Sequence, residues 1–330
     1  MNFFSKLIKP RLPAAALGLT GEGVAVVSLE RRRDGALLVR RAGYAPLSEG
    51  VVHPNFDEPN VVDAGELAAS MQGLVTSAGL QKRKRWSVAL PEAATRTTIL
   101  TLEGGTASRA ETEEMLRWKT ERGFGTPVEE LRVARERLRP DAQGRPRYLA
   151  TAVRLSVLAE YEGLLSSLGW HAGLILPRHM GEAWWLMRGG AATNASPASD
   201  SLLVSTHHEG FTAVLLRHSQ PLLVRSIVCE AEDRVDELYR FLLFYRDRVQ
   251  APAAPLDAEE APANRADTIG RMLIAGDGIE HTEAGAIIEE TLGTRPRLVT
   301  PADVRLALPS DELDFDAIAA PAGLAALAWA

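Results

Sequence analysis

Three short glycine-containing turns, each following an apolar strand, are the places where this chain could bind a phosphate. They are residues 20–23, 208–210 and 276–278. Glycine lets backbone N–H groups approach an anion closely, so such a turn can cradle a phosphate. A tight turn also needs glycine for its geometry alone, and this second reading is the more common one. The candidate ligand-binding residues are Gly18, Thr20, Gly21, Gly23, Ser205, Gly210, Gly276, Asp277 and Gly278.

Hydrolysis at these turns would also need a carboxylate to hold a hydrated magnesium ion and to position water. Neither of the first two turns has an aspartate at the end of its strand. Glu22 and Glu209 stand nearby, but a longer acid one or two positions later has a different geometry. Asp277 is the only aspartate in a glycine turn. The patterns GxxxxGK[ST] and GxGxxG are also missing from the sequence, so we predict no catalytic residue.

Metal ligands of the usual kinds are equally sparse. His207 and His208 are adjacent, so in a strand they would point to opposite faces and could not easily bind one ion together. The single cysteine, Cys229, excludes an internal disulfide and a zinc site built from several cysteines. We therefore predict no metal site, and the cysteine usage is typical of a reducing compartment.

Two similar hairpins carry the first two turns. Residues 14–29 form an apolar run, a polar turn and a second run of alternating valine and alanine, and residues 201–227 repeat this pattern with a third run. Because the two hairpins lie about half a chain apart, we predict a duplicated α/β architecture of two lobes with a cleft between them. The glycine turns would converge if the two lobes close over that cleft.

The remaining elements alternate between strands and helices. Residues 96–169 read as strand, helix, strand, strand, helix, which indicates a small inserted α+β subdomain. The other helices are predicted at 64–78, with Asp63 as the N-terminal cap, and at 180–187, 233–249, 284–292 and 321–330. The other strands are predicted at 36–41, 86–91, 174–176, 271–275 and 297–299.

Composition limits the class of partner. The 330 residues carry a net charge of -6, which argues against general binding of nucleic acid. Residues 1–12 mix apolar and basic side chains but contain no apolar run of about 20 residues, so we expect an amphipathic tail on a cytoplasmic protein. The basic run at residues 81–85 reads as a solvated loop, and a binding surface is the less common alternative.

The chain resembles the PilM family of type IV pilus assembly proteins, relatives of FtsA with an actin-like ATPase fold. LGLTGEGVAVVSL stands where that family has its first phosphate loop, and LLVSTHHEGFTAVLLRHSQPLLVRSI where it has the second. MLIAGDGIEH is similar to the adenosine turn, and WSVALPEAATRTTILTL to the strand that leads into the inserted subdomain. The most specific stretch is EEMLRWKTERGFGTPVEELRV, which is similar to a helix of the family.

The resemblance implies an actin-like fold, related to ribonuclease H, with domains in a fixed order. These are a tail at 1–12, a first lobe at 13–95 and 170–190, an inserted subdomain at 96–169, a connecting loop at 191–200 and a second lobe at 201–330.

The departures from the family bear on activity. Each phosphate loop of the family carries an aspartate that organises magnesium and water, whereas Thr20 and Ser205 occupy those places here. A neutral hydroxyl cannot replace the charge of a carboxylate. Bulky residues precede Gly210, and Asp277 stands where the adenosine turn has glycine. We predict that ATP and magnesium bind weakly or not at all and that hydrolysis is absent.

Two other readings stay open. The first is an active actin-like ATPase that couples ATP binding to the assembly of a complex or filament. The second is the cytoplasmic domain of a type II secretion component, although such a domain normally precedes a membrane span, and no such apolar run occurs here.

The family's role implies a platform at the inner face of the cytoplasmic membrane. Proteins of this family capture the cytoplasmic tail of an inner-membrane partner, PilN, in a groove beside the inserted subdomain, and they work with other pilus assembly components. An extended tail would be recognised by main-chain pairing and side-chain pockets. In this chain we expect the groove between segments 86–103 and 109–138. Its candidate walls, each of which could instead be ordinary core, are Leu100, Leu116, Trp118, Phe124 and Pro127.

Overall fold

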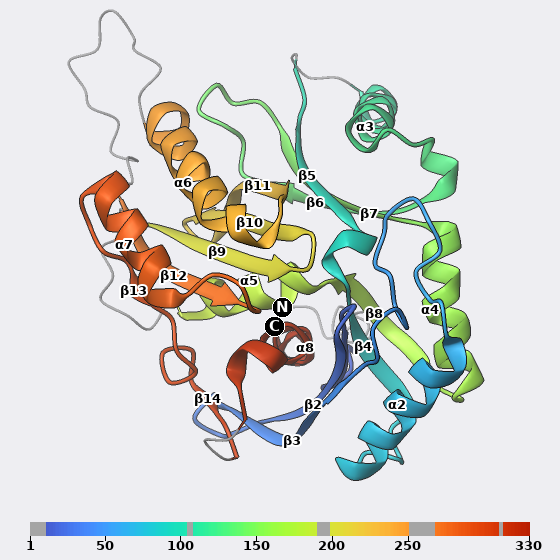
Figure 1. Ribbon diagram of the computed structural model, residues 1–330. Helices are drawn as coiled ribbons and strands as arrows, with labels where there is room; N and C mark the ends of the chain where they lie inside the picture. Colours follow the sequence, from blue (N-terminus) through green and yellow to red (C-terminus); the bar gives the residue numbers. More distant parts are fainter. Residues whose placement is uncertain (1–10, 104–107, 190–198, 251–267, 310–312) are drawn as a thin grey trace, which may run out of the picture. The chain divides into compact units, whose positions relative to one another are not determined.

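The computed structural model describes residues 11–103, 108–189, 199–250, 268–309 and 313–330 (Figure 1). The chain divides into two compact units. Unit 1 comprises Met1–Ala94, Ser156–Trp184 and Arg305–Ala330, and unit 2 comprises Thr95–Leu155 and Trp185–Val304. Most of the predicted tail at 1–12 and of the predicted connecting loop at 191–200 lies outside the described residues.

Unit 1 is built on a six-stranded sheet in the order β14-β3-β2-β1-β4-β8. Its strands are β1 (Ala15–Leu19), β2 (Gly23–Arg31), β3 (Leu37–Pro46), β4 (Arg85–Leu90), β8 (His171–Pro177) and β14 (Leu306–Ala307). β1 pairs antiparallel with β2 and parallel with β4. Every residue of β1 is buried, which is the pattern of a strand with both faces covered.

Helices provide that cover. They are α2 (Ala64–Ser77), α4 (Leu155–Ser167) and α8 (Phe315–Ala326). α5 (Arg178–Gly189), whose last residues belong to unit 2, packs on α8 through Gly181. α8 lies on one face of the sheet, and α2 and α4 lie on the other (Figure 1). The predicted cap of α2 is confirmed, because the Asp63 side chain accepts from the Glu66 N–H at 2.8 Å. α8 begins earlier than predicted, because Pro321 lies inside the helix and does not start it.

Unit 2 contains the predicted central meander, which the structure confirms. Its five-stranded sheet has the order β11-β10-β9-β12-β13. The strands are β9 (Asp200–His207), β10 (Gly210–Arg217), β11 (Gln220–Val228), β12 (Ile269–Ala275) and β13 (Arg297–Leu298). α6 (Arg234–Phe244), which continues as a π-helical turn at Tyr245–Gln250, and α7 (His281–Leu292) pack on this sheet through a core that includes Val204, Phe241, Ile274 and Ile288.

The inserted subdomain has the predicted order of elements. β5 (Arg96–Thr101), β7 (Arg147–Arg154) and β6 (Leu131–Leu138) form a three-stranded sheet in that spatial order. α3 (Arg109–Phe124) starts at a capping box between Ser108 and Glu111, and it ends at Gly125, whose φ is 68°.

The division into units differs from the predicted domain scheme. The three-stranded sheet belongs to unit 2, where the Arg147 guanidinium donates to the Leu222 carbonyl at 2.8 Å. Residues 305–330 belong to unit 1, because α8 packs against β1, β2 and β4. The predicted boundaries of the actin-like lobes stay a prediction. Within the described residues, no helix combines the length and apolar character needed to cross a membrane.

Candidate functional site

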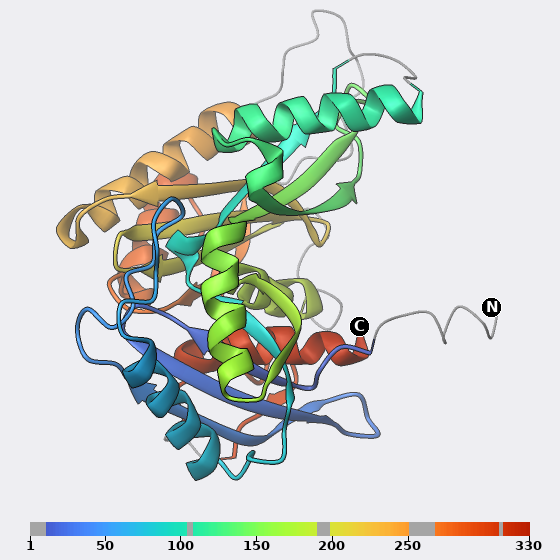
Figure 2. The ribbon, with the colours of Figure 1, turned by 90° about the vertical axis from the view of Figure 1, so that its right-hand side faces the viewer.

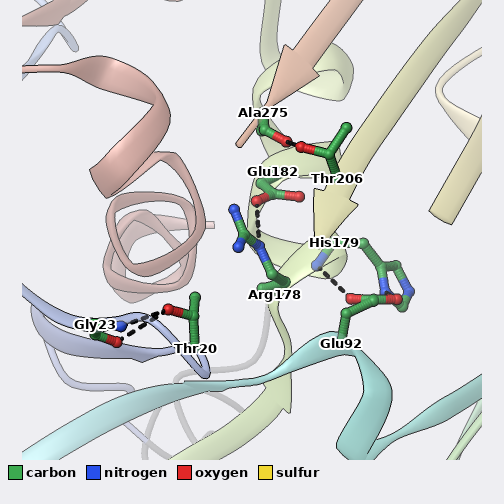
Figure 3. Close-up of polar contacts among 8 residues, drawn as sticks. All are labelled: Thr20, Gly23, Glu92, Arg178, His179, Glu182, Thr206 and Ala275. Carbon is green, nitrogen blue, oxygen red and sulfur yellow. Dashed lines mark hydrogen bonds and ion pairs between the residues drawn. The ribbon is translucent and has the colours of Figure 1, made fainter. Parts of the chain in front are cut away.

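The first turn, residues 20–23, joins β1 to β2 in unit 1. The Thr20 hydroxyl accepts from the Glu22 N–H at 3.2 Å and from the Gly23 N–H at 2.9 Å. It also donates to the Gly23 carbonyl at 3.1 Å, as Figure 3 shows. Two amides that could have bound a phosphate are therefore bonded to the threonine of the turn itself.

Other parts of unit 1 pack directly on the glycines of this region. The contacts pair Gly18 with Pro321, Gly21 with Pro54 and Gly23 with the Tyr44 ring. A Cβ at Gly21 would lie 3.2 Å from Pro54 Cδ. These glycines thus have an intramolecular reason for being small, and their presence is no evidence for a bound phosphate.

The second and third turns, residues 208–210 and 276–278, follow strands that are neighbours in unit 2. β9 and β12 run parallel, with Ser205 opposite Ala275. The predicted ligand-binding hydroxyl of Ser205 is fully buried, and it has no hydrogen-bond partner among the described residues. The next residue, Thr206, connects the strands instead, because its hydroxyl donates to the Ala275 carbonyl at 3.1 Å (Figure 3). A Cβ at Gly276 would meet that hydroxyl at 2.7 Å.

Arg234, at the start of α6, binds both of these turns. Its Nη2 donates to the carbonyls of His207 and His208 at 2.7 and 3.0 Å, and its Nη1 donates to the Asp277 carbonyl at 3.4 Å. The residue is only 7% exposed. Gly278 has a φ of 104°, and a Cβ there would overlap the Arg234 guanidinium. The guanidinium therefore occupies the space between the second and third turns.

A second group of charges is buried in unit 1 at the start of α5. The Arg178 guanidinium donates to Glu182 at 2.9 Å, and the Glu92 carboxylate lies 2.7 Å from Nδ1 of His179 (Figure 3). Glu92 also accepts from the His179 backbone N–H at 3.4 Å, which gives the helix an N-terminal cap from a distant residue.

The Glu92 carboxylate sets the charge of His179. Burial alone would lower the pKa of His179, but the charge and hydrogen bond of Glu92, together with the charge of Glu182, outweigh burial, and the pKa is raised. The imidazolium form is thereby favoured. The pKa of Arg178 is also raised, because Glu182, Glu92 and the Glu22 of the first turn together outweigh the cost of its burial. Within the described residues, no cluster of histidine, cysteine and acidic side chains could hold a metal ion.

The sequence prediction did not identify Arg234, Thr206 or the buried charges at α5. A signal for Arg234 was present, because this residue stands four positions before Leu238 on the apolar stripe of its helix. A basic residue on a buried helix face needs acceptors nearby. Arg178 and Glu182 likewise have the spacing of a helical ion pair.

The five predicted groove residues fall into two classes. Leu100, Leu116 and Phe124 are buried core residues of the inserted subdomain, which was the alternative reading for each of them. Trp118 is 54% exposed, and Pro127 is exposed as well. The Arg122 guanidinium lies 5.3 Å from the centroid of the Trp118 ring, so the two side chains form a cation–π pair at the surface. The groove itself stays a prediction.

We compared the chain with family models, with curated protein sequences and with solved structures, and matches were found among the solved structures. No family model matches the chain, and no curated protein sequence matches it. A PilM–PilN type IV pilus biogenesis complex matches with a TM-score of 0.71 and 18% identity, over 97% of this chain and 98% of that chain.

Two further solved structures have lower scores. One is a Bacteroides thetaiotaomicron protein with an actin-like ATPase fold and unknown function, with a TM-score of 0.46 and 11% identity over 97% of this chain and 98% of that chain. The other is the cytoplasmic domain of EpsL, an inner-membrane component of the type II secretion system of Vibrio cholerae. Its TM-score is 0.43 and its identity 11%, over 86% of this chain and 96% of that chain. On the strength of the first match, the chain has the mixed α/β actin-like ATPase fold with several sheets, as the sequence predicted.

Proposed function

We propose that this protein is a cytoplasmic platform of a type IV pilus or related secretion apparatus. It binds the cytoplasmic tail of a PilN-like inner-membrane protein and does not hydrolyse ATP. The observation that carries the platform role is the structural likeness to a PilM–PilN complex over nearly the whole of both chains. Function resides in sites and not in folds, so a direct measurement of tail binding tests the role.

The proposed loss of hydrolysis is supported by the groups of the chain itself that fill the three glycine turns. In unit 1, amides of the first turn donate to Thr20, and Pro54 packs on Gly21. In unit 2, Arg234 fills the space between the second and third turns. A phosphate at any of these turns would have to displace the groups that close it, and no aspartate stands at the carboxyl end of β1 or of β9 to hold magnesium.

The inserted subdomain offers a surface suited to an extended peptide. Among the residues that the structure describes, β6 pairs with β7 only, so one of its edges has main-chain groups that an added strand could use. On the neighbouring helix, Trp118 and Arg122 form an exposed pair, and tryptophan and arginine are the residue types most often dominant in protein interfaces. We therefore assign the tail-binding surface to Trp118, Arg122, Pro127 and the edge of β6.

A binding measurement tests this assignment. The probe is a labelled synthetic peptide that carries the cytoplasmic tail of a PilN protein. Trp118→Ala should weaken binding by about 30-fold, the effect of removing a dominant interface residue. Tyr239→Ala removes an aromatic residue that is 39% exposed on α6 and should leave binding unchanged. Unchanged affinity in a folded triple variant of Trp118, Arg122 and Pro127 would reject the surface.

A further inference from the structure

The strand register of the inserted subdomain shows which side chains of its edge strand, β6, share a face with α3. A Cβ at Gly123 of α3 would lie 3.7 Å from the Leu100 side chain of β5, so α3 packs on that face. Leu100 is opposite Tyr148 of β7, and Tyr148 is opposite Arg137 of β6. Directly opposite residues of antiparallel strands point to the same face. Arg137 and, two positions earlier, Arg135 therefore lie on the α3 side.

Two ion pairs hold α3 beside this edge. The Arg135 guanidinium lies 3.3 Å from the Glu113 carboxylate, and the Arg117 guanidinium pairs with Glu129, which stands two positions before the strand. Figure 2 shows α3 in the upper part of the view, beside the green strands β6 and β7. Glu113 and Glu129 are thus already neutralised by cations of the same subdomain.

The charge that remains unpaired on the α3 side of β6 is positive. Three arginines of the strand and the residue after it are exposed and have no carboxylate partner among the described residues: Arg132, Arg137 and Arg139. Glu130, just before the strand, pairs with Arg154 of β7 at 2.8 Å. Glu136 is the single acid of β6, and it lies on the face away from α3, because it is one position from Arg137.

The outer edge of β6 is open to solvent. The strand pairs with β7 only, among the residues that the structure describes, and Ala134, Glu136 and Arg137 are exposed along it. Charged side chains often guard such an edge against aggregation. That role is served by charges of either sign, however, so it does not explain why the unpaired charge on the α3 side has one sign only.

We propose that the peptide segment that adds to the edge of β6 is acidic, with carboxylates at alternate positions that face Arg135 and Arg137. A strand added beside β6 would point every second side chain to the α3 side. Opposite charges directly across a sheet stabilise the pairing, and like charges weaken it. Arg135 gives one N–H to Glu113 and keeps further donors, because a guanidinium carries five.

This inference rests on the proposed function and deepens it, because the edge of β6 belongs to the surface assigned to the partner's tail. The proposed function requires only that a tail binds the inserted subdomain. The inference adds the sign and the spacing of the charges in the segment that pairs with β6. A tail without acids could still bind through Trp118, so the two proposals can fail separately.

Fluorescence anisotropy with synthetic peptides tests the proposal on the full chain. The probe is a labelled peptide of about ten residues that alternates threonine and glutamate, and its control has lysine in place of glutamate. The acidic peptide should bind at least about tenfold more tightly, and high salt should weaken its binding. The double variant Arg137→Glu, Arg139→Glu should remove this preference. The matched control Arg32→Glu, Arg33→Glu reverses two exposed arginines of unit 1 and should keep the affinity within about twofold.

A second pair of peptides separates strand pairing from simple attraction of charge. N-methylation of every second residue of the acidic peptide, in the phase that faces β6, removes main-chain donors and keeps every carboxylate. This peptide should lose binding, because an added strand is held by main-chain hydrogen bonds. N-methylation in the other phase removes only donors that face solvent, so that peptide should keep its binding.

Three outcomes would overturn the inference. The first is equal affinity for the glutamate and lysine peptides, or no binding of either. The second is an equal loss in the two charge-reversed variants, which would mean that net charge and not the edge of β6 governs binding. The third is full binding of both N-methylated peptides. Circular dichroism on each variant excludes loss of fold as the cause.

Competition with the PilN tail peptide separates the inference from the proposed function. The tail should displace the acidic probe, because both use the edge of β6. A tail that binds without displacing the probe would contradict the inference and leave the platform role intact. A probe that binds as expected, beside a tail that does not bind at all, would contradict the proposed function and leave the preference of β6 for acidic strands intact.

Discussion

The first and second glycine turns have the same sequence pattern but are closed in different ways. The first turn closes on itself, because the Thr20 hydroxyl bonds two amides within four residues of sequence. The second turn is closed from outside by Arg234, which stands 26 residues after His208 and donates to its carbonyl. A glycine turn after a strand therefore says little about phosphate binding until the groups that pack on it are known.

The two turns should also differ in how much free energy of unfolding is lost when the group that closes them is removed. Thr20 is half-buried, so water can replace a lost hydrogen bond there. Arg234 is buried, so its loss would strand carbonyls away from water. Substitutions at the second turn should therefore lower the free energy of unfolding more than equivalent substitutions at the first turn.

The largest contrast is expected between two glycines that each begin the second strand of a hairpin. Gly210 has a φ of 139°, and a Cβ there would overlap the Ile227 carbonyl, which is backbone. Gly210→Ala should lower the free energy of unfolding by at least about 3 kcal/mol. Gly23→Ala should cost about 1 kcal/mol or less, because its obstacle is the Tyr44 side chain, which can rotate. Urea unfolding of both variants measures this, and equal costs would remove the contrast.

Removal of the Arg234 guanidinium should have the next largest effect. Arg234→Ala leaves three carbonyls without their donor and should cost about 2–3 kcal/mol of unfolding free energy. Hydrogen exchange should rise at residues 207–210 and 276–279 and stay unchanged at residues 20–23. Arg240→Ala removes an exposed arginine of the same helix that pairs with half-buried Glu237, so it should cost less than about 0.5 kcal/mol. Similar losses in the two variants would contradict the account of Arg234.

The buried pair of His179 and Glu92 in unit 1 should make the free energy of unfolding depend on pH. The raised pKa of His179 means that the stabilisation by Glu92 is fully present below pH 6.5, the ordinary value, and is lost as the pH rises through the raised one. The slope is at most about 1.4 kcal/mol per pH unit. His179→Gln should flatten this slope above pH 6.5, whereas Arg234→Ala should leave it unchanged. Urea unfolding at each pH from 6 to 9 measures the slope of the free energy of unfolding. An equal slope in His179→Gln and the unmodified protein would mean that another group causes it.

The smallest effect is expected at the first turn. Thr20→Val removes the hydroxyl that bonds Glu22 and Gly23, and it should lower the unfolding free energy by about 1 kcal/mol. Thr20→Ser keeps the hydroxyl and should restore most of that loss. Denaturation curves of the two variants measure this. If Thr20→Val lowers the free energy of unfolding more than Arg234→Ala does, the turn closed by its own threonine is not the less costly one to disrupt, and the account is wrong.

Periodicity and turn residues were enough to predict most of the fold. The hairpins, the inserted subdomain and the cap of α2 follow from local patterns, because strand alternation and capping are properties of a few adjacent residues. α8 was predicted too short, because a proline usually starts or ends a helix, whereas Pro321 lies inside this one.

The candidate site was harder to predict, because its closure depends on distant contacts. The sequence around residues 207–210 does not indicate that Arg234 packs there. The sequence around Gly21 likewise does not indicate that Pro54 packs on it. The same limit explains the groove residues. Leu116 and Trp118 are two positions apart on one helix, so they lie on opposite faces. The tertiary structure shows that the face of Leu116 is core and that the face of Trp118 is exposed.

Calorimetric titration of the unmodified protein with ATP and magnesium tests the central claim most directly. If the chain's own groups fill the turns, no binding should be detected up to about 1 mM nucleotide, which corresponds to a binding free energy weaker than about -4 kcal/mol. The tail peptide, titrated into the same preparation, should still bind and show that the protein is folded. A low-micromolar dissociation constant for ATP would contradict the account and favour an active ATPase.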